Sequence, residues 1–152
     1  MSSAQAAYDK LTNTLGQVTP EAFLGLPDNE LKQLGFSRQK TRYCRILAEA
    51  LISGELDLNE LILKSDEDVF ETLIGLKGIG PWTASIYLLM VFRRLDVWPR
   101  GDLALLVSMQ EVFGLDAKPS VEEAESMAEA WRPWRSVAAR ILWHSYLSRR
   151  GQ

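Results

Sequence analysis

The chain is 152 residues long, with 47% hydrophobic residues, 24% charged residues and a formal net charge of −3. This balance is typical of one globular domain, or of two small helical lobes that share a core. No apolar run approaches the roughly 18 to 20 residues that span a bilayer, and residues 1–10 lack the apolar segment of a signal peptide. One cysteine and one histidine exclude an internal disulfide, an iron–sulfur cluster and other soft side-chain metal sites. We therefore expect an intracellular protein without a membrane segment or cofactor.

Helical periodicity dominates the first part of the chain, and strand alternation is nearly absent. Helices are predicted over 3–15, 37–54 and 57–61, with a short turn that opens at Thr19–Pro20 and ends near Leu26, and a brief segment over 28–35. Ser3, Asp28 and Ser37 are predicted to be caps, and Asp57 is predicted to begin its helix. The inward stripe of the helix over 37–54 is predicted to be Tyr43, Ile46, Leu47, Ala50 and Leu51. Cys44, on the same helix, is expected to be a small buried apolar residue.

The second part of the chain continues in helices, which are predicted over 65–73, 81–92, 102–113, 120–129 and 131–150. The sequence from Ser65 to Asp68 is a variant capping box, and that from Ser120 to Glu123 is a complete one. Pro81 suits a first helical turn, and Gly114 ends the third of these helices. Residues 94–101 form an irregular stretch, and no low-complexity or repeated segment is present. The fold class is therefore all-α.

Charge is unevenly distributed along the chain. Acidic residues gather in 57–71 and 116–129, whereas basic residues gather in 38–45, 93–100 and 132–150. A basic face on an acidic body can bind nucleic acid, because attraction depends on the local field rather than the net charge. Mixed charge is also common on helical surfaces, so this pattern alone leaves both interpretations open.

The sequence LKGIGPWTA at residues 76–84 lies between two predicted helices. Glycines on either side of Ile79 permit backbone angles that side chains forbid. Ile79 can then point into the core, while N–H groups at Gly80 and the following helix start face an anion. This pattern indicates a helix-hairpin-helix that grips a DNA phosphate through its backbone. The alternative is an ordinary helical turn with a glycine C-cap.

The predicted phosphate contacts of this hairpin are Lys77, Gly78, Ile79, Gly80 and Thr83. Backbone carbonyls of Leu76 and Ile79 can also hold a monovalent cation, Na⁺ or K⁺, between protein and phosphate. No side-chain metal site is expected.

Two further motifs follow in order, DVWPRGDLAL at residues 96–105 and AWRPWRSVAARILW at residues 130–143. With the hairpin, they make nearly the whole chain resemble the helix-hairpin-helix DNA glycosylases, and most of all the 3-methyladenine DNA glycosylase II branch. The resemblance implies one glycosylase domain over 1–152. Within it, it implies a hairpin at 66–93, a catalytic loop at 94–102 and C-terminal helices over 103–150.

The resemblance implies that Asp102 is the catalytic carboxylate. In the family, the damaged nucleotide is flipped out of the duplex and the aspartate faces its sugar. A fixed anion stabilises the positive charge that the sugar acquires as the glycosidic bond breaks. Asp102 is equally suited to cap the helix that follows it, and one residue can serve both purposes.

Trp82 and Trp143 match positions that line the base pocket in this branch. An indole face attracts a cationic alkylated purine such as 3-methyladenine or 7-methylguanine. Relatives that also cut the backbone carry a lysine where Trp82 stands, so the resemblance implies a monofunctional hydrolase without lyase activity. A core position is the alternative for both tryptophans. Tyr87 is a further candidate for the pocket, and a core position is the favoured alternative.

The remaining tryptophans, Trp98, Trp131 and Trp134, are predicted to be packing residues, and His144 a structural or rim residue. Arg100 and Arg135 are candidates to contact phosphates around the flipped nucleotide. Each can alternatively pair with the acidic helix at 122–129. The expected partner is double-stranded DNA with alkylated bases. The expected location is the cytoplasm, at the nucleoid in a bacterium, or the nucleus in a eukaryote.

The chain departs from the family at its front. The helix and loop that insert a wedge into the DNA stack have no counterpart before residues 1–4, so an N-terminally truncated fold is expected. The loss of that helix would expose apolar surface near 142–147, which a homodimer or a second chain can cover. Weak activity is expected without the wedge, and the alternative is a non-catalytic DNA-binding or interaction module.

Overall fold

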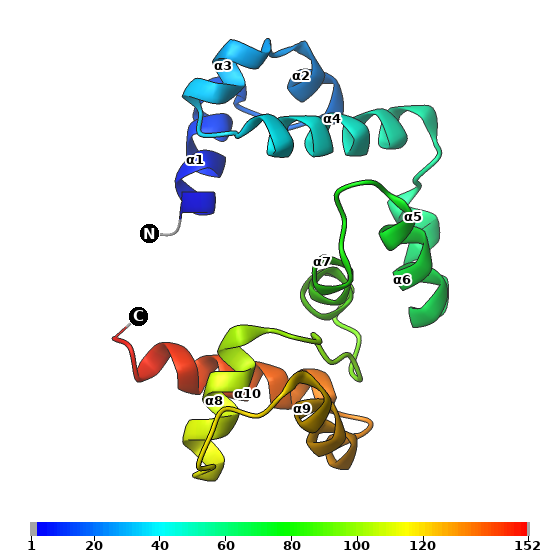
Figure 1. Cartoon of the computed structure of the whole chain (residues 1–152). Helices are drawn as coiled ribbons and strands as arrows, with labels where there is room; N and C mark the ends of the chain where they lie inside the picture. Colours follow the sequence, from blue (N-terminus) through cyan, green and yellow to red (C-terminus); the bar gives the residue numbers. More distant parts are fainter. Residues whose placement is uncertain (1–2, 152) are drawn as a thin grey trace. The chain divides into compact units, whose positions relative to one another are not determined.

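The computed structural model describes residues 3–151, and side chains from residue 4 onward. Every regular element in this range is helical, as the sequence predicts (Figure 1). No helix within the range is both long and apolar enough to cross a membrane. The chain divides into two compact units, one formed by residues 1–63 and 75–78 and the other by residues 64–74 and 79–152.

The first unit contains five helices within its described residues. They are α1 (Ser3–Leu15), α2 (Pro20–Gly25), α3 (Asp28–Gln33), α4 (Arg38–Ser53) and α5 (Leu58–Leu61). Its core cluster consists of the buried residues Leu11, Phe23, Leu26 and Leu31. Phe36 meets the Phe23 ring edge-on with a centroid distance of 5.6 Å. These apolar contacts hold the short helices against α4.

The cap predicted for Ser37 is confirmed, and Thr19 and Asp57, where the sequence predicts a turn and a helix to begin, are N-caps as well. Thr19 accepts from the Ala22 N–H, Ser37 from the Lys40 N–H, and Asp57 from two N–H groups at the start of α5. The cap predicted for Asp28 is wrong, because Pro27 is the N-cap residue and Asp28 lies inside α3. The Asp28 carboxylate instead forms an ion pair of 2.8 Å with Arg45. The cap predicted for Ser3 falls on a side chain outside the described range.

The inward stripe predicted for α4 is correct only in part. Ala50 is buried, but the other four predicted residues are half-buried, and the buried positions also include Thr41 and Ala48. Cys44 is half-buried against the core cluster of the first unit. Burial raises the pKa of the Cys44 thiol, and the positive charge of Lys40 partly offsets this effect.

The second unit contains the remaining helices. They are α6 (Asp66–Gly75), α7 (Pro81–Ile86), the π-helical turn η1 (Tyr87–Val91), α8 (Leu103–Phe113), α9 (Val121–Ala128), the 3₁₀ turn η2 (Glu129–Trp131) and α10 (Arg135–Ser148). Helices α8 and α10 pack side by side (Figure 1). Residues buried in this unit include Leu89, Leu105, Met109 and Ala139.

Capping chemistry places the boundaries of α8 and α9 as predicted. Asp102 caps α8, and Gly114 ends it with a positive φ of 64°. Ser120 and Glu123 form the complete capping box at the start of α9. Ser65 also accepts from the Asp68 N–H, although α6 runs two residues beyond the predicted end at residue 73.

Two features of this unit differ from the prediction. The last helix begins at Arg135 rather than at Trp131, because Pro133 disfavours helical angles at Arg132, which is extended with ψ of 141°. The helix that follows the hairpin changes from α to π geometry over Tyr87–Val91. Apolar periodicity does not distinguish these two kinds of helix.

Candidate active site

Asp102 lies at the centre of a cluster of nitrogen donors in the second unit. Its Oδ2 atom accepts a hydrogen bond of 2.8 Å from the indole N–H of Trp82 on α7. Its Oδ1 atom accepts from the indole N–H of Trp143 on α10 at 3.2 Å and from the Leu105 backbone N–H at 3.0 Å. We call Trp82, Asp102 and Trp143 the indole–carboxylate cluster.

Each member of the indole–carboxylate cluster is held by a separate helix. Trp82 is the second residue of α7, Asp102 is the N-cap of α8, and Trp143 lies in the second half of α10. Asp102 is only 8% exposed, so a charge there must be stabilised by hydrogen bonds. The three N–H donors orient both carboxylate oxygens. The result is a fixed anion beside two aromatic rings.

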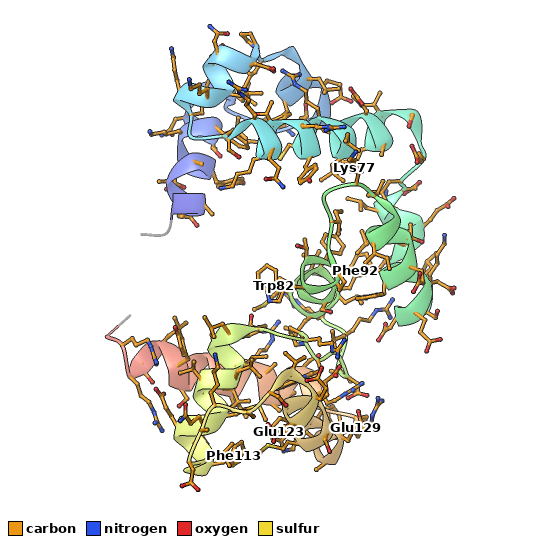
Figure 2. The ribbon with its side chains drawn as sticks, viewed as in Figure 1. Lys77, Trp82, Phe92, Phe113, Glu123 and Glu129 are labelled. Carbon is orange, nitrogen blue, oxygen red and sulfur yellow. The ribbon has the colours of Figure 1, made fainter. Side chains whose placement is uncertain are left out.

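The exposure of the two indoles bears on the choice between pocket and core. The Trp82 side chain projects from α7 and is 48% exposed, which excludes a core position (Figure 2). Trp143 is half-buried. The structure therefore brings the predicted catalytic residue and both predicted pocket tryptophans together. Their roles in a reaction stay predictions.

Tyr87 is not placed like the two tryptophans. Its ring meets Phe92 edge-on with a centroid distance of 5.0 Å, and burial raises the pKa of its hydroxyl. Because Tyr87 follows Trp82 by five residues, about 140° separates them around an α-helix. The structure therefore favours the core alternative for Tyr87 over the pocket position.

The other tryptophans divide between packing and exposure. Trp98 and Trp131 contact each other with ring centroids 5.5 Å apart, and Phe113 stacks on Trp131 at 6.0 Å. Packing is thus confirmed for these two residues. For Trp134 the prediction is wrong, because its side chain is 54% exposed beside the helix break at Pro133. His144 is exposed, which agrees with a rim position.

The loop that leads to Asp102 is tied to the start of α10. Arg135 donates three side-chain hydrogen bonds to Asp96, two to its carboxylate and one to its carbonyl, and another to Glu129. The buried hydroxyl of Ser136 accepts from the Val97 N–H at 2.9 Å and donates to the Val97 carbonyl at 3.3 Å. These bonds fix the loop a few residues before the carboxylate of the cluster.

The two arginines that are predicted to contact phosphates, Arg100 and Arg135, form ion pairs with carboxylates of this chain. Arg135 is 16% exposed and its guanidinium is occupied by Asp96 and Glu129. Arg100 pairs with Glu122 and Glu125 on α9 but stays 56% exposed. The structure thus favours the ion-pair alternative for Arg135. A phosphate contact of Arg100 stays a prediction.

Asp96 gives this loop a predicted dependence on pH. Partial burial opposes ionisation, but hydrogen bonds from Arg135 and the charges of Arg135 and Arg132 lower the pKa of Asp96 overall. The carboxylate therefore stabilises the fold above the unfolded-state pKa, and this contribution is lost as the pH falls through the folded-state pKa. We expect Asp96→Asn to lower the free energy of unfolding by about 1 to 3 kcal/mol at pH 7.

The difference in the free energy of unfolding between the native chain and Asp96→Asn should become smaller below about pH 4. Denaturant unfolding at pH 7 and at pH 3 measures this difference. Asp116→Asn, at an exposed aspartate, is the control and should have the free energy of unfolding of the native chain at both pH values. An equal loss of stability in Asp96→Asn at pH 7 and pH 3 would contradict the electrostatic role.

The hairpin turn contains two glycines, and only one of them stands at a position that excludes a side chain. Gly78 has φ of +106°, and an added Cβ would overlap the Tyr43 ring and lie 2.6 Å from the Tyr43 Cβ. Gly80 has φ of −94°, which any residue adopts, and a Cβ there meets nothing within 4 Å. The prediction that side chains are forbidden is therefore confirmed for Gly78 and wrong for Gly80.

The other turn residues differ in exposure. Lys77 is exposed (Figure 2). Thr83 is exposed as well, and Ile79 is half-buried rather than fully inward. Gly80 is the N-cap of α7 and offers no side-chain cap to the first N–H groups of the helix. The predicted phosphate and cation at this turn stay predictions.

Sequence reasoning missed the contacts that join these parts. The indole hydrogen bonds to Asp102 and the approach of Tyr43 to Gly78 connect residues 20 to 41 positions apart in the chain. The signal in the sequence is limited to residue types, because no local pattern specifies such pairs.

Comparison with known proteins identifies relatives of the chain. It is 35% identical over 136 residues to the alkylbase DNA glycosidase-like protein mag2 of Schizosaccharomyces pombe, which covers 88% of this chain and 64% of that protein. It is 34% identical to a putative DNA-3-methyladenine glycosylase, YfjP, of Bacillus subtilis, covering 83% of this chain and 44% of that protein. The chain thus spans 44% to 64% of the length of these two relatives.

Solved structures show the same fold. The S. pombe 3-methyladenine DNA glycosylase Mag1, in complex with abasic DNA, superposes with a TM-score of 0.87 at 30% identity, covering 92% of this chain and 70% of that chain. A DNA-3-methyladenine glycosidase of Bacillus halodurans superposes with a TM-score of 0.82 at 31% identity, covering 96% and 69%. The family model of the HhH-GPD superfamily base excision DNA repair proteins matches residues 1–135. The chain therefore belongs to the HhH-GPD superfamily of base excision DNA repair proteins.

Proposed function

We propose that this chain is a monofunctional DNA glycosylase that hydrolyses the N-glycosidic bond of alkylated purines of the 3-methyladenine and 7-methylguanine type. The observation that carries the proposal is the indole–carboxylate cluster, in which a buried carboxylate is fixed by two indole N–H groups. The names of the relatives, which are glycosylases of 3-methyladenine or alkylated bases, support the same substrate class.

The role proposed for Asp102 follows from the charge that develops during bond cleavage. As the bond between sugar and base breaks, the sugar acquires oxocarbenium character. A carboxylate held in advance by three N–H donors stabilises this charge without reorganising. The same carboxylate can orient the water that completes hydrolysis. The cationic base takes the bonding electron pair and leaves as the neutral base. Water then supplies the new hydroxyl on the sugar, and its remaining proton passes to the Asp102 carboxylate and from there to solvent.

The role proposed for Trp82 follows from its exposed indole. Alkylation at N3 or N7 gives the purine a positive charge, which an electron-rich indole face attracts. The positive charge also makes the base a good leaving group, so a strong general acid is not needed. Because an indole cannot form a Schiff base, Trp82 supplies no nucleophile for strand cleavage.

The role proposed for the hairpin is to bind double-stranded DNA independently of sequence. The uncapped start of α7 presents backbone N–H groups and the positive end of the helix dipole. Lys77 adds an exposed charge next to the turn. The open space around Gly80 permits the backbone to approach a phosphate closely.

The experiment that tests this function is incubation of the purified chain with methylated duplex DNA. The released bases are separated and quantified, and the DNA strand is examined before and after alkaline treatment. We expect free methylated purines and abasic sites, with strands intact until alkali is added. DNA binding without base release would favour a non-catalytic module, and strand cleavage without alkali would contradict the monofunctional proposal.

Trp143 offers a test of the indole–carboxylate cluster itself. Trp143→Phe keeps an aromatic ring but removes the N–H that donates to Asp102 Oδ1. We expect kcat/KM for base release to fall roughly tenfold, because a hydrogen bond to a charged group is lost. Trp131→Phe, at a tryptophan that packs on Trp98 and Phe113, is the matched control. Equal effects of the two exchanges would show that packing, rather than the donated bond, accounts for the loss.

A further inference from the structure

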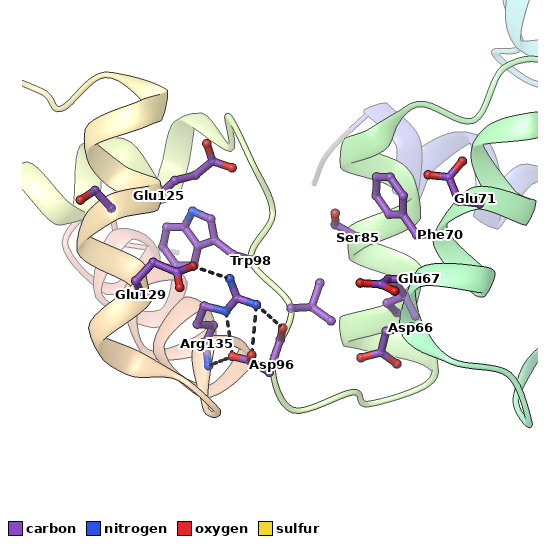
Figure 3. A pocket seen from close by; sticks show the side chains of 13 residues that line it. Asp66, Glu67, Phe70, Glu71, Ser85, Asp96, Trp98, Glu125, Glu129 and Arg135 are labelled. Atoms are coloured by element: carbon purple, nitrogen blue, oxygen red, sulfur yellow. Dashed lines mark hydrogen bonds and ion pairs between the residues drawn. The ribbon is translucent and has the colours of Figure 1, made fainter.

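A pocket of about 440 Å³ lies in the second unit (Figure 3). Its walls are formed by α6, by α7 and η1, by the loop that leads to Asp102, and by α9 with the start of α10. None of the three residues of the indole–carboxylate cluster lines it. The pocket is therefore distinct from the indole–carboxylate cluster.

The lining of this acidic pocket carries six carboxylates and one guanidinium. Four of the carboxylates already pair with arginines, those of Asp66, Asp96, Glu125 and Glu129. Glu67 and Glu71 have no hydrogen-bond or ion-pair partner among the described residues. They lie one turn apart on α6, where like charges repel. A bound cation would relieve this repulsion.

Ser85 provides a second and independent indication of a ligand. This α7 residue is 6% exposed, and its hydroxyl is directed toward the pocket (Figure 3). The described residues provide no hydrogen-bond partner for it. The residue as a whole is buried, but its Oγ atom opens to the pocket, so a ligand group that donates to it would take the place of water.

The lining specifies the kind of cation. No three His, Cys, Asp or Glu side chains of the described residues lie close enough together to hold a metal ion. The pocket is much larger than one ion, and Phe70 and Trp98 lie on opposite walls (Figure 3). Aromatic faces next to carboxylates are suited to ammonium and guanidinium groups. The chemistry therefore favours an organic cation over Mg²⁺ or Ca²⁺.

We propose that this pocket binds an organic cation with at least two ammonium or guanidinium groups, which pair with Glu67 and Glu71 and donate to the Ser85 hydroxyl. Such a cation is available as a free polyamine or as neighbouring lysine and arginine side chains of a protein segment. Val97 and Trp98 line the pocket a few residues before Asp102. A bound cation would therefore also hold the loop that carries the proposed catalytic carboxylate.

Calorimetric titration of the full chain tests the proposal with two probes, spermidine and a blocked tri-arginine peptide, and with Mg²⁺ for comparison. The measurement needs neither DNA nor base release, so its result is independent of the proposed glycosylase function. Saturable binding of spermidine alone would assign the site to a free polyamine. Binding of the peptide alone would assign the site to a protein segment. Both results would support the proposal. Binding of neither probe, or equal binding of Mg²⁺, would overturn it.

Substitutions locate the binding site. The double substitution Glu67→Gln with Glu71→Gln should lower the affinity for the probe by roughly tenfold or more, since two charge-assisted contacts are lost. Glu55→Gln with Glu60→Gln makes the same change in net charge at exposed residues of the first unit, and affinity should stay within about twofold. Equal weakening by the two double substitutions would reveal nonspecific attraction and overturn the proposal.

Ser85→Ala distinguishes a ligand contact from a structural hydroxyl. We expect it to weaken the affinity for the probe by roughly threefold to tenfold. The midpoint of thermal unfolding without the probe should stay unchanged or rise slightly. Unchanged affinity would show that the hydroxyl does not contact the cation and would contradict that part of the proposal.

Discussion

Replacing Asp102 with asparagine is expected to slow the release of an alkylated purine by roughly 10² to 10³-fold, which is about 2.7 to 4 kcal/mol of transition-state stabilisation. The exchange preserves the shape of the side chain and its capping oxygen, because asparagine caps helices as well as aspartate. It removes the negative charge. It also places an amide N–H₂ group where an indole N–H of Trp82 or Trp143 now donates.

Single-turnover base release, with protein in excess over DNA, measures this effect without interference from product release. DNA affinity and the midpoint of thermal unfolding serve as controls and should change little. A rate within threefold of the native chain would show that the carboxylate is a helix cap without a part in the reaction. Asp102→Ala would then lower stability by about 1 kcal/mol with no further loss of rate.

The two glycines of the hairpin are expected to respond in opposite ways to the same substitution. Gly78→Ala should lower the free energy of unfolding by about 2 to 4 kcal/mol, because a side chain is disfavoured at φ of +106° and its Cβ meets the Tyr43 ring. Gly80→Ala should leave stability within about 0.5 kcal/mol, because its backbone angles and surroundings admit a methyl group.

DNA binding separates the two glycines further. Gly80→Ala should weaken the affinity for unmodified duplex DNA by roughly tenfold, because the added methyl group would stand between the backbone and the proposed phosphate. Denaturant unfolding and a binding titration at fixed salt measure the two quantities. Native affinity in a fully folded Gly80→Ala chain would contradict the phosphate site. Native stability in Gly78→Ala would contradict the contact with Tyr43.

Helix boundaries were predictable where local chemistry determines them. The caps at Ser37, Asp57 and Ser120 and the stop at Gly114 depend on hydrogen bonds and backbone angles within a few residues. Asp28 also has the residue type of a cap, but a long-range ion pair with Arg45 competes for its carboxylate. The start of α10 was missed because the apolar pattern continues through Pro133 although the backbone does not.

The candidate site was predictable as a set of residues but not as an arrangement. The motifs that carry the resemblance identify Asp102, Trp82 and Trp143, yet they do not reveal that both indoles donate to the same carboxylate. Helices α7, α8 and α10 must pack before these side chains meet. Tyr87 illustrates the same limit, because the sequence leaves a pocket position and a core position open, and only the contact of its ring with Phe92 favours the core.

The most direct test of the central claim is release of a single alkylated purine from a defined duplex by the native chain and by Asp102→Asn, measured in parallel at saturating protein. We predict that the native chain releases the base and leaves an abasic site in an intact strand. We predict that Asp102→Asn binds the same duplex but releases the base at least about 100-fold more slowly. Equal rates in the two proteins, or no release by a native chain that binds the duplex, would contradict the account.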